Sequence, residues 1–203
     1  MSQKRKEEII LATLYLASKN GLKAISMQMI ADQVGIKKAS LYNHFSSKEE
    51  LVKEMYIFIR NRSKAQIPVF QPQLLYHLSA EEILSTAVFN YVKMTSLPEI
   101  TMFYKVLYSE QAFNPLAASI LLEETNKMIE ATQQLLSLLE EKELLHFSSL
   151  ERSAETFALT IHALMDIRAH ECFISGEENK KDDSKLYRYI QWFVKENQKK
   201  EVK

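Results

Sequence analysis

The sequence predicts an all-α protein of nine helices, and three observations lead to this prediction. The chain has 203 residues, 46% hydrophobic and 26% charged, which are the proportions of a globular protein and not of a disordered one. Its 3 glycines and 4 prolines are too few for the tight turns of an all-β fold. No apolar run reaches the roughly 18 residues that would span a bilayer. We therefore expect a cytoplasmic helical protein with no membrane partner, and its single cysteine excludes an internal disulfide.

Apolar residues at helical spacing, bounded by glycines, predict three helices at the start of the chain. The first covers residues 5–19 and is followed by Gly21, which suits the left-handed position after a helix. Two short helices follow, over 27–34 and about 37–44, with Gly35 between them. Because only a tight turn separates these two, they are expected to pack closely against each other.

Capping signals place the six remaining helices. Serine followed three residues later by glutamate forms a capping box, and proline is favoured in the first turn of a helix. Pro68 and Pro72 interrupt the helical pattern, so the stretch 66–78 is the expected domain boundary. The signals are the capping boxes that begin at Ser47, Ser79 and Ser148, the pair Asn114–Pro115, and Pro98. The expected helices run from 48 to about 65, from 80 to about 96, from 98 onward, from 115 to about 145, over 149–175 and over 184–199.

The net charge of zero conceals an asymmetry along the chain. Residues 1–64 carry 12 Lys and Arg against 6 Asp and Glu, whereas the remaining 139 residues carry 14 against 20. A basic front and an acidic back indicate that residues 1–64 meet a polyanion. Solvated lysines with no partner would give the same count, so charge alone leaves both interpretations open.

The two short helices around Gly35 satisfy the steric demands of a helix-turn-helix. A small residue, Ala31, stands where the second helix would cross the first, and Gly35 tolerates the positive φ that the turn needs four positions later. Four apolar residues can pin both helices to the body of the domain, namely Ile30, Val34, Ile36 and Leu41. In such a motif the second helix lies in the major groove of DNA.

At this point the residues resemble a known family. The run from Gly35 to Leu51, which reads GIKKASLYNHFSSKEEL, resembles the DNA-binding signature of the TetR family of transcriptional regulators. The segments 9–21 and 26–31 resemble the family's first two helices, and the whole likeness covers about residues 5–55. It implies a homodimer with an N-terminal three-helix DNA-binding domain and a helical C-terminal domain for ligand binding and dimerisation. We accordingly expect a DNA-binding domain over 1–47, a connecting helix and linker over 48–78, and a ligand-binding and dimerisation domain over 79–203.

The resemblance also suggests which side chains meet double-stranded DNA. It places Lys37, Lys38 and Ala39 where the family reads bases, and Tyr42, His44 and Lys48 where it touches phosphates. Lysine and tyrosine donors suit phosphate oxygens, and a lysine can also donate to guanine O6 or N7. The expected interface also includes the other outward donors of the second short helix and two residues at the start of the first. The full set of expected DNA-binding residues is Ser26, Gln28, Lys37, Lys38, Ala39, Ser40, Tyr42, Asn43, His44 and Lys48.

The C-terminal half is rich in soft, wide side chains that suit a small-molecule pocket, although the same residue types also fill ordinary cores. His162, Asp166 and His170 lie at i, i+4 and i+8 of one expected helix, so they share a face. This stripe could orient a polar ligand or bind a metal ion, or lie at a surface or dimer interface, and we expect no metal. The candidate pocket residues are Tyr91, Met94, Phe103, Tyr104, Tyr108, Met128, His162, Met165 and Asp166.

The last two expected helices are apolar on more than one face, which predicts a partner on each face. Two such helices per chain would form a four-helix bundle across a two-fold axis. Burial within one chain is the other way to cover such faces. The expected dimer residues are Phe157, Ile161, Leu164, Tyr187, Ile190, Trp192 and Val194.

These patterns together predict a DNA-binding regulator of transcription. The main hypothesis is a repressor that an unknown small-molecule effector releases from a palindromic operator. The alternative keeps the DNA-binding domain and places the protein under the control of a protein partner. We expect neither an enzyme nor a cofactor, because nothing resembles a nucleophile–base pair or a phosphate-binding loop.

Overall fold

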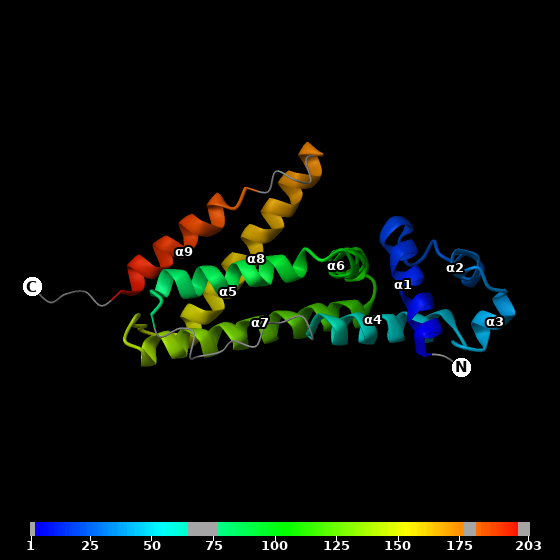
Figure 1. Ribbon diagram of the computed structural model, residues 1–203, viewed down its shortest axis with the longest axis horizontal. Coiled ribbons are helices and arrows are strands. Elements are labelled where there is room, and N and C mark those ends of the chain that lie inside the picture. Colours follow the sequence, from blue (N-terminus) through cyan, green and yellow to red (C-terminus); the bar gives the residue numbers. More distant parts are fainter. Residues whose placement is uncertain (1–2, 65–76, 177–181, 199–203) are drawn as a thin grey trace, which may run out of the picture. The chain divides into compact units, whose positions relative to one another are not determined.

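The computed structural model describes residues 3–64, 77–176 and 182–198, and within these ranges it contains nine α-helices and no strand (Figure 1). The predicted all-α fold is confirmed. No helix in the described part of the chain combines the length and the apolar character needed to cross a membrane. The helices are α1 (Gln3–Asn20), α2 (Met27–Val34), α3 (Lys38–Tyr42), α4 (Lys48–Lys64), α5 (Ala80–Thr95), α6 (Pro98–Glu110), α7 (Pro115–Glu141), α8 (Leu150–Ser175) and α9 (Ser184–Asn197).

The chain divides into two compact units. Unit 1 comprises Met1–Pro68 and Lys93–Leu122, and unit 2 comprises Val69–Val92 and Glu123–Lys203. This division differs from the expected domains, because the segment with α6 groups with the N-terminal helices: α6 packs against α1 and α4. The expected boundary over 66–78 lies almost wholly outside the described residues.

In unit 1, α1 packs against α2, α4 and α6, and the short α3 packs against α2. The core is made by the apolar stripes that the sequence pattern predicts for these helices. Large side chains with no more than 2% exposure fill it, among them Ile9, Leu14, Ile30, Leu41, Phe45, Leu51, Met55, Ile59, Ile100 and Phe103. The polar faces of α2 and α3 are thereby left on the outside of unit 1.

Several predicted capping contacts are present. The Ser79 hydroxyl accepts a hydrogen bond from the Glu82 amide at 3.3 Å, and the Glu82 carboxylate accepts one from the Ser79 amide at 2.8 Å. The Ser79 amide and the Ser79 hydroxyl both donate to the Glu82 carboxylate, and these bonds to its charged form lower the pKa of Glu82. Pro98 occupies the first turn of α6, and the Asn114 side chain caps α7 by accepting from the Leu116 amide at 3.0 Å.

Two predicted helix limits in unit 2 are wrong. The cap of α8 is Ser149 and not Ser148, since the Ser149 hydroxyl accepts from the Arg152 amide. Helix α7 ends at Glu141 and does not continue to about residue 145. The chain turns there so that Leu145 and Phe147 can enter the core of unit 2, where both are buried.

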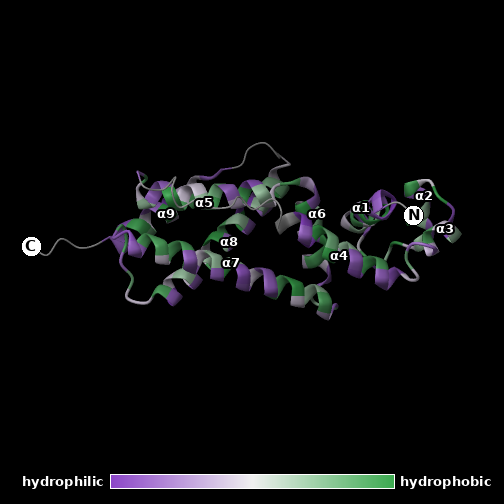
Figure 2. Ribbon diagram, turned by 60° about the horizontal axis from the view of Figure 1, so that its bottom comes forward, coloured by the Kyte–Doolittle hydropathy of each residue, from purple (hydrophilic) through white to green (hydrophobic). Residues whose placement is uncertain are grey.

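The core of unit 2 joins α5, the C-terminal part of α7, α8 and α9. Figure 2 shows hydrophobic and hydrophilic segments alternating along α7, as expected for a helix with one buried face. Aromatic rings form part of the core, with the centroids of Phe157 and Phe193 4.6 Å apart and those of Phe147 and Phe193 6.1 Å apart.

This core covers part of the expected dimer surface within a single chain. Phe157, Ile161, Ile190 and Val194 are no more than 5% exposed within the single chain, so their side chains have little area left for a partner. The residues of the same set that remain exposed are Tyr187 and Trp192, whereas Leu164 packs at the edge of the core. The Tyr187 ring also lies 4.5 Å from that of Phe89 within unit 2. The sequence pattern identified apolar faces on α8 and α9 correctly but could not tell which of them the monomer covers.

Tyr56 of α4 is a polar residue in the core of unit 1. Its side chain is 1% exposed and meets Phe103 edge-on, with ring centroids 5.8 Å apart. The hydroxyl has no hydrogen-bond partner among the described residues. Burial, helped by the negative charge of Glu110, raises the pKa of Tyr56 from 10.0 to about 12. A buried hydroxyl without a partner costs free energy, because water would have solvated it in the unfolded chain.

We expect Tyr56→Phe to leave the free energy of unfolding unchanged or to raise it by about 1 kcal/mol, because it removes an unsatisfied hydroxyl. In the wild type the folded state holds the Tyr56 proton between pH 10 and 12 while the unfolded state releases it, so stability falls with rising pH there. The variant should lose part of this pH dependence. Urea denaturation at pH 8 and at about pH 11 measures both effects. A clear loss of stability at pH 8 would show that the hydroxyl has a partner.

Candidate nucleic-acid interface

The turn between α2 and α3 has the geometry of a Schellman motif. Helix α2 ends at Gly35, which is in the left-handed conformation with φ 73° and ψ 36°. The Ile36 amide donates to the Ala31 carbonyl at 3.0 Å, and the Gly35 amide donates to the Asp32 carbonyl at 3.1 Å. These two bonds satisfy carbonyls at the end of α2 and direct the chain into α3. Ala31 itself is fully buried, as its place at the helix crossing requires.

Helix α3 is shorter than predicted. It covers Lys38–Tyr42, with Lys37 as the N-terminal cap, and not the expected residues 37–44. Asn43 and His44 lie in the turn that follows, where the His44 amide donates to the Leu41 carbonyl at 2.9 Å. The helix ends early because Phe45 has to turn into the core, where it is 1% exposed.

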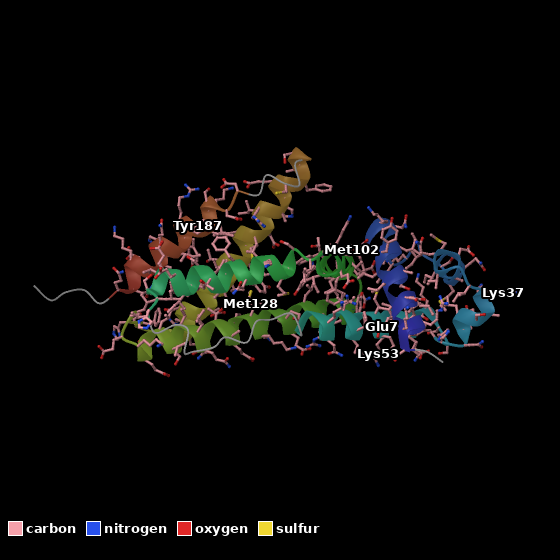
Figure 3. The ribbon with its side chains drawn as sticks, viewed as in Figure 1. Glu7, Lys37, Lys53, Met102, Met128 and Tyr187 are labelled. Carbon is pink, nitrogen blue, oxygen red and sulfur yellow. The ribbon has the colours of Figure 1, made fainter. Side chains whose placement is uncertain are left out.

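The polar residues of this segment face outward while Leu41 faces inward. Leu41 is fully buried, and Figure 3 shows Lys37 at the outer edge of the α2–α3 segment. The Lys38 ammonium lies 6.0 Å from the centre of the Tyr42 ring, within the range of a cation–π contact. Lys37, Lys38, Ala39, Tyr42 and Asn43 are exposed, and Ser40 and His44 are half-buried. The structure therefore brings seven of the ten expected DNA-binding residues together on one surface, which we call the α3 surface.

The other three expected residues make contacts within the protein. The Ser26 hydroxyl caps α2 by accepting from the Met29 amide at 3.2 Å, and its own proton remains able to donate. The Gln28 side-chain amide donates to the Asp32 carboxylate at 2.7 Å. Lys48 is half-buried, and its ammonium donates to the backbone carbonyls of Leu22 and Ile25.

The nine expected pocket residues are divided between the two units. Met94, Phe103, Tyr104 and Tyr108 belong to unit 1, where Met94 and Phe103 are buried. Tyr91, Met128, His162, Met165 and Asp166 belong to unit 2. The expectation of a single pocket lined by all nine residues therefore stays a prediction.

Within unit 2, the carboxylates of Glu124 and Asp166 lie close enough to Tyr91 to act on it electrostatically. Burial, together with the charges of Glu124 and Asp166, raises the pKa of Tyr91 to about 12, so its hydroxyl stays protonated at neutral pH. His162 lies beside Asp166, with Nδ1 and Oδ2 3.6 Å apart. Glu124 was not among the expected pocket residues, although its place one turn before Met128 on α7 puts both on the same helix face. Across the described ranges, no group of three His, Cys, Asp or Glu residues is arranged to hold a metal ion.

For the N-terminal part of the chain, comparisons with known proteins point to the same family as the resemblance seen in the sequence. Residues 9–55 match the family model described as bacterial regulatory proteins, tetR family. The HTH-type transcriptional repressor KstR2 of Mycolicibacterium smegmatis is 41% identical over 51 residues, which are 25% of this chain and 25% of that protein. The chain thus matches about a quarter of the length of its curated relatives.

Similarity to solved structures extends over nearly the whole chain. MexZ, a repressor responsible for antibiotic resistance in Pseudomonas aeruginosa, has a TM-score of 0.70 and 18% identity, with 98% of this chain and 97% of that one covered. The flavonoid-responsive regulator FrrA has a TM-score of 0.68 and 21% identity, with 98% and 100% covered. At these identities the similarity establishes the fold.

Gly35→Ala should lower the free energy of unfolding by about 1 kcal/mol, because alanine is strained at positive φ. The space around the glycine is open, so no clash adds to this cost. Gly35→Asn is the matched control, since asparagine tolerates the left-handed conformation and should lose less. Urea denaturation of both variants checks the prediction, which equal losses would contradict.

Proposed function

We propose that this chain, whose residues 9–55 match the family model of bacterial regulatory proteins of the tetR family, binds DNA sequence-specifically and represses transcription as a homodimer. The observation that supports the proposal best is the α3 surface, where exposed lysine and tyrosine donors surround a helix anchored by the buried Leu41. Such donors suit phosphate oxygens and the edges of bases in the major groove. The excess of Lys and Arg over residues 1–64 favours the same polyanion.

In this proposal two α3 helices, one from each protomer, enter successive major grooves of a palindromic operator. The two-fold symmetry of a dimer matches the symmetry of such a site, with half-sites about 34–36 Å apart or a multiple of that distance. Lys37, Lys38 and Ala39 face the bases, and Tyr42, Asn43 and His44 face the flanking phosphates. Ser40, Ser26 and Gln28 lie at the border of this interface.

We further propose that a small molecule binds in unit 2 and releases the DNA. The response of FrrA to flavonoids, in a protein of the same fold, supports this part of the proposal. So does Tyr91, whose phenol lies within electrostatic reach of the carboxylates of Glu124 and Asp166. A ligand releases DNA only if it binds more tightly to the conformation that does not fit the operator.

The double variant Lys38→Ala/Tyr42→Ala should bind DNA about tenfold more weakly or worse, because it removes two donors from each α3 surface. The probe is a labelled duplex selected by the wild-type protein from a random-sequence library, and binding is measured by fluorescence anisotropy. Lys195→Ala, which removes an exposed charge from α9 of unit 2, is the matched control and should bind like the wild type. Equal binding by all three proteins would exclude the α3 surface as the interface.

A thermal-shift screen of phenolic and amine-bearing aromatic compounds tests the effector. A compound that raises the melting temperature of the wild type should also weaken its binding to the selected duplex. Asp166→Asn should reduce both effects, whereas Glu155→Gln, an exposed carboxylate on the same helix, should keep them. If the protein binds DNA but no compound shifts its melting temperature, control by a protein partner is the better explanation.

A further inference from the structure

The first turn of α1 carries three positive charges and no negative one. It comprises Gln3, Lys4, Arg5 and Lys6, all of them exposed. Cations are disfavoured at this end of a helix, because the helix dipole places partial positive charge there. The charge of Arg5 is compensated by Glu8 at a distance of 2.7 Å. Within the described ranges, by contrast, no carboxylate forms an ion pair with Lys6 and no group accepts a hydrogen bond from its ammonium.

Lys6 lies on the face of α1 that is buried farther along the helix. Ile10 and Thr13 follow it at i+4 and i+7 and are no more than 5% exposed. At Lys6 this face extends past the core and reaches the loop after α3, since the ammonium lies 5.5 Å from the centre of the Phe45 ring. The methylene stem of such a lysine covers apolar surface while its charge stays in water. Because Phe45 is buried, its ring is a fixed support for this side chain.

This contact places Lys6 beside two of the expected contacts to phosphate. Phe45 directly follows His44 and precedes Lys48 by three residues. Figure 1 shows the N-terminal end of α1 beside the chain that joins α3 to α4, in agreement with the contact. The ammonium of Lys6 therefore lies at an edge of unit 1 that continues the α3 surface.

The carboxylate of Glu50 lies within electrostatic reach of Lys6 but forms no ion pair with it. It accepts hydrogen bonds from the Ser46 hydroxyl at 2.5 Å and from the Ser46 amide at 2.6 Å. These bonds, helped by the charge of Lys6, lower the pKa of Glu50, so its carboxylate is negative at neutral pH. A negative charge at this edge repels DNA phosphates, and Lys6 is placed to offset that repulsion while its own three N–H donors remain available.

We propose that Lys6 is a further DNA-binding residue, whose ammonium contacts a backbone phosphate next to those expected for His44 and Lys48. The inference rests on the proposed DNA binding. It extends the interface to α1, a helix outside the helix-turn-helix itself. Because the phosphate group is the same at every base pair, this contact adds affinity without selecting a sequence.

The experiment compares Lys6→Met with Lys105→Met in the full chain. Lys105 is the matched control, an exposed lysine of α6, which packs against α1 and α4 and lies away from α3 (Figures 1 and 2). The affinities for the selected duplex and for a duplex of scrambled sequence are measured by anisotropy over a series of KCl concentrations. Both variants replace an exposed side chain by an unbranched one that suits a helix.

Lys6→Met should weaken binding to both duplexes by a similar factor, about three- to tenfold, because a phosphate contact carries no sequence information. The slope of log K against log salt should become shallower by about 0.9 for each lost phosphate contact, or about 1.8 for a dimer. Lys105→Met should keep the affinity and the slope of the wild type. Lys6→Arg should recover most of both, since arginine keeps the charge and donates to phosphate.

An affinity and a slope of Lys6→Met that equal those of the wild type would overturn the inference and leave the proposed function intact. A loss confined to the selected duplex would also overturn it, because such a loss indicates a contact to a base. If the wild type binds no duplex at any salt concentration, the proposed function fails and this inference fails with it.

A measurement on the wild type needs no substitution. In nitrogen-15 NMR spectra of the lysine side chains, the Lys6 Nζ signal should shift when either duplex is added, whereas the Lys105 signal should stay in place. A Lys6 signal that stays in place with both duplexes would show that its ammonium does not meet the DNA and would contradict the inference.

Discussion

The burial of Leu41 is the contact on which the conformation of α3 depends. Helix α3 has five residues, and an isolated helix needs more than twice that length to be even marginally stable in water. Its conformation therefore has to come from tertiary packing, and full burial of a leucine side chain contributes about 1.5–3 kcal/mol. Ala31 lets α2 approach closely, and the Schellman turn at Gly35 fixes the direction in which the chain enters α3. With one apolar side chain inward, the remaining residues of so short a helix are presented outward.

The charge excess over residues 1–64 overstates the positive charge that DNA would meet. Arg62 is paired at 2.8 Å with Glu99, which lies outside that range, while Lys48 is bonded to backbone carbonyls. The ion pair is partly exposed and contributes little to stability, but it cancels charge locally. Lys37 and Lys38, by contrast, are exposed on the α3 surface, beside the exposed donors of Tyr42 and Asn43. A total charge indicates a class of partner, whereas the contacts of each cation decide where that partner binds.

The sequence was most informative where structure depends on residues close in the chain. Ser26, Gly35, Ser79 and the Asn114–Pro115 pair are caps in the structure because a cap needs only the right side chain within three residues of the helix end. The limits at Ser148 and near residue 145 failed because the chain turns there to bury Leu145 and Phe147, a demand set by distant helices. For the same reason the pattern on α8 and α9 identified apolar faces but not their partners. At the candidate site, residue types predicted the outward donors of α3, whereas the inward course of Lys48 depends on carbonyls more than twenty residues away.

The length of α3 also bears on why a regulator of this kind would need two copies. Five helical residues rise about 7.5 Å, which is little more than two base-pair steps of about 3.4 Å. One such helix can therefore inspect only a few base pairs, and each correctly read pair contributes about 1–3 kcal/mol of discrimination. For two base pairs this amounts to about 2–6 kcal/mol, which reaches only the lower part of the 4–10 kcal/mol that separates specific from non-specific binding in typical regulators. A second copy doubles the number of base pairs that are read and adds the requirement that the two half-sites lie at a fixed spacing. This spacing is enforced only if α3 is held rigidly within its domain.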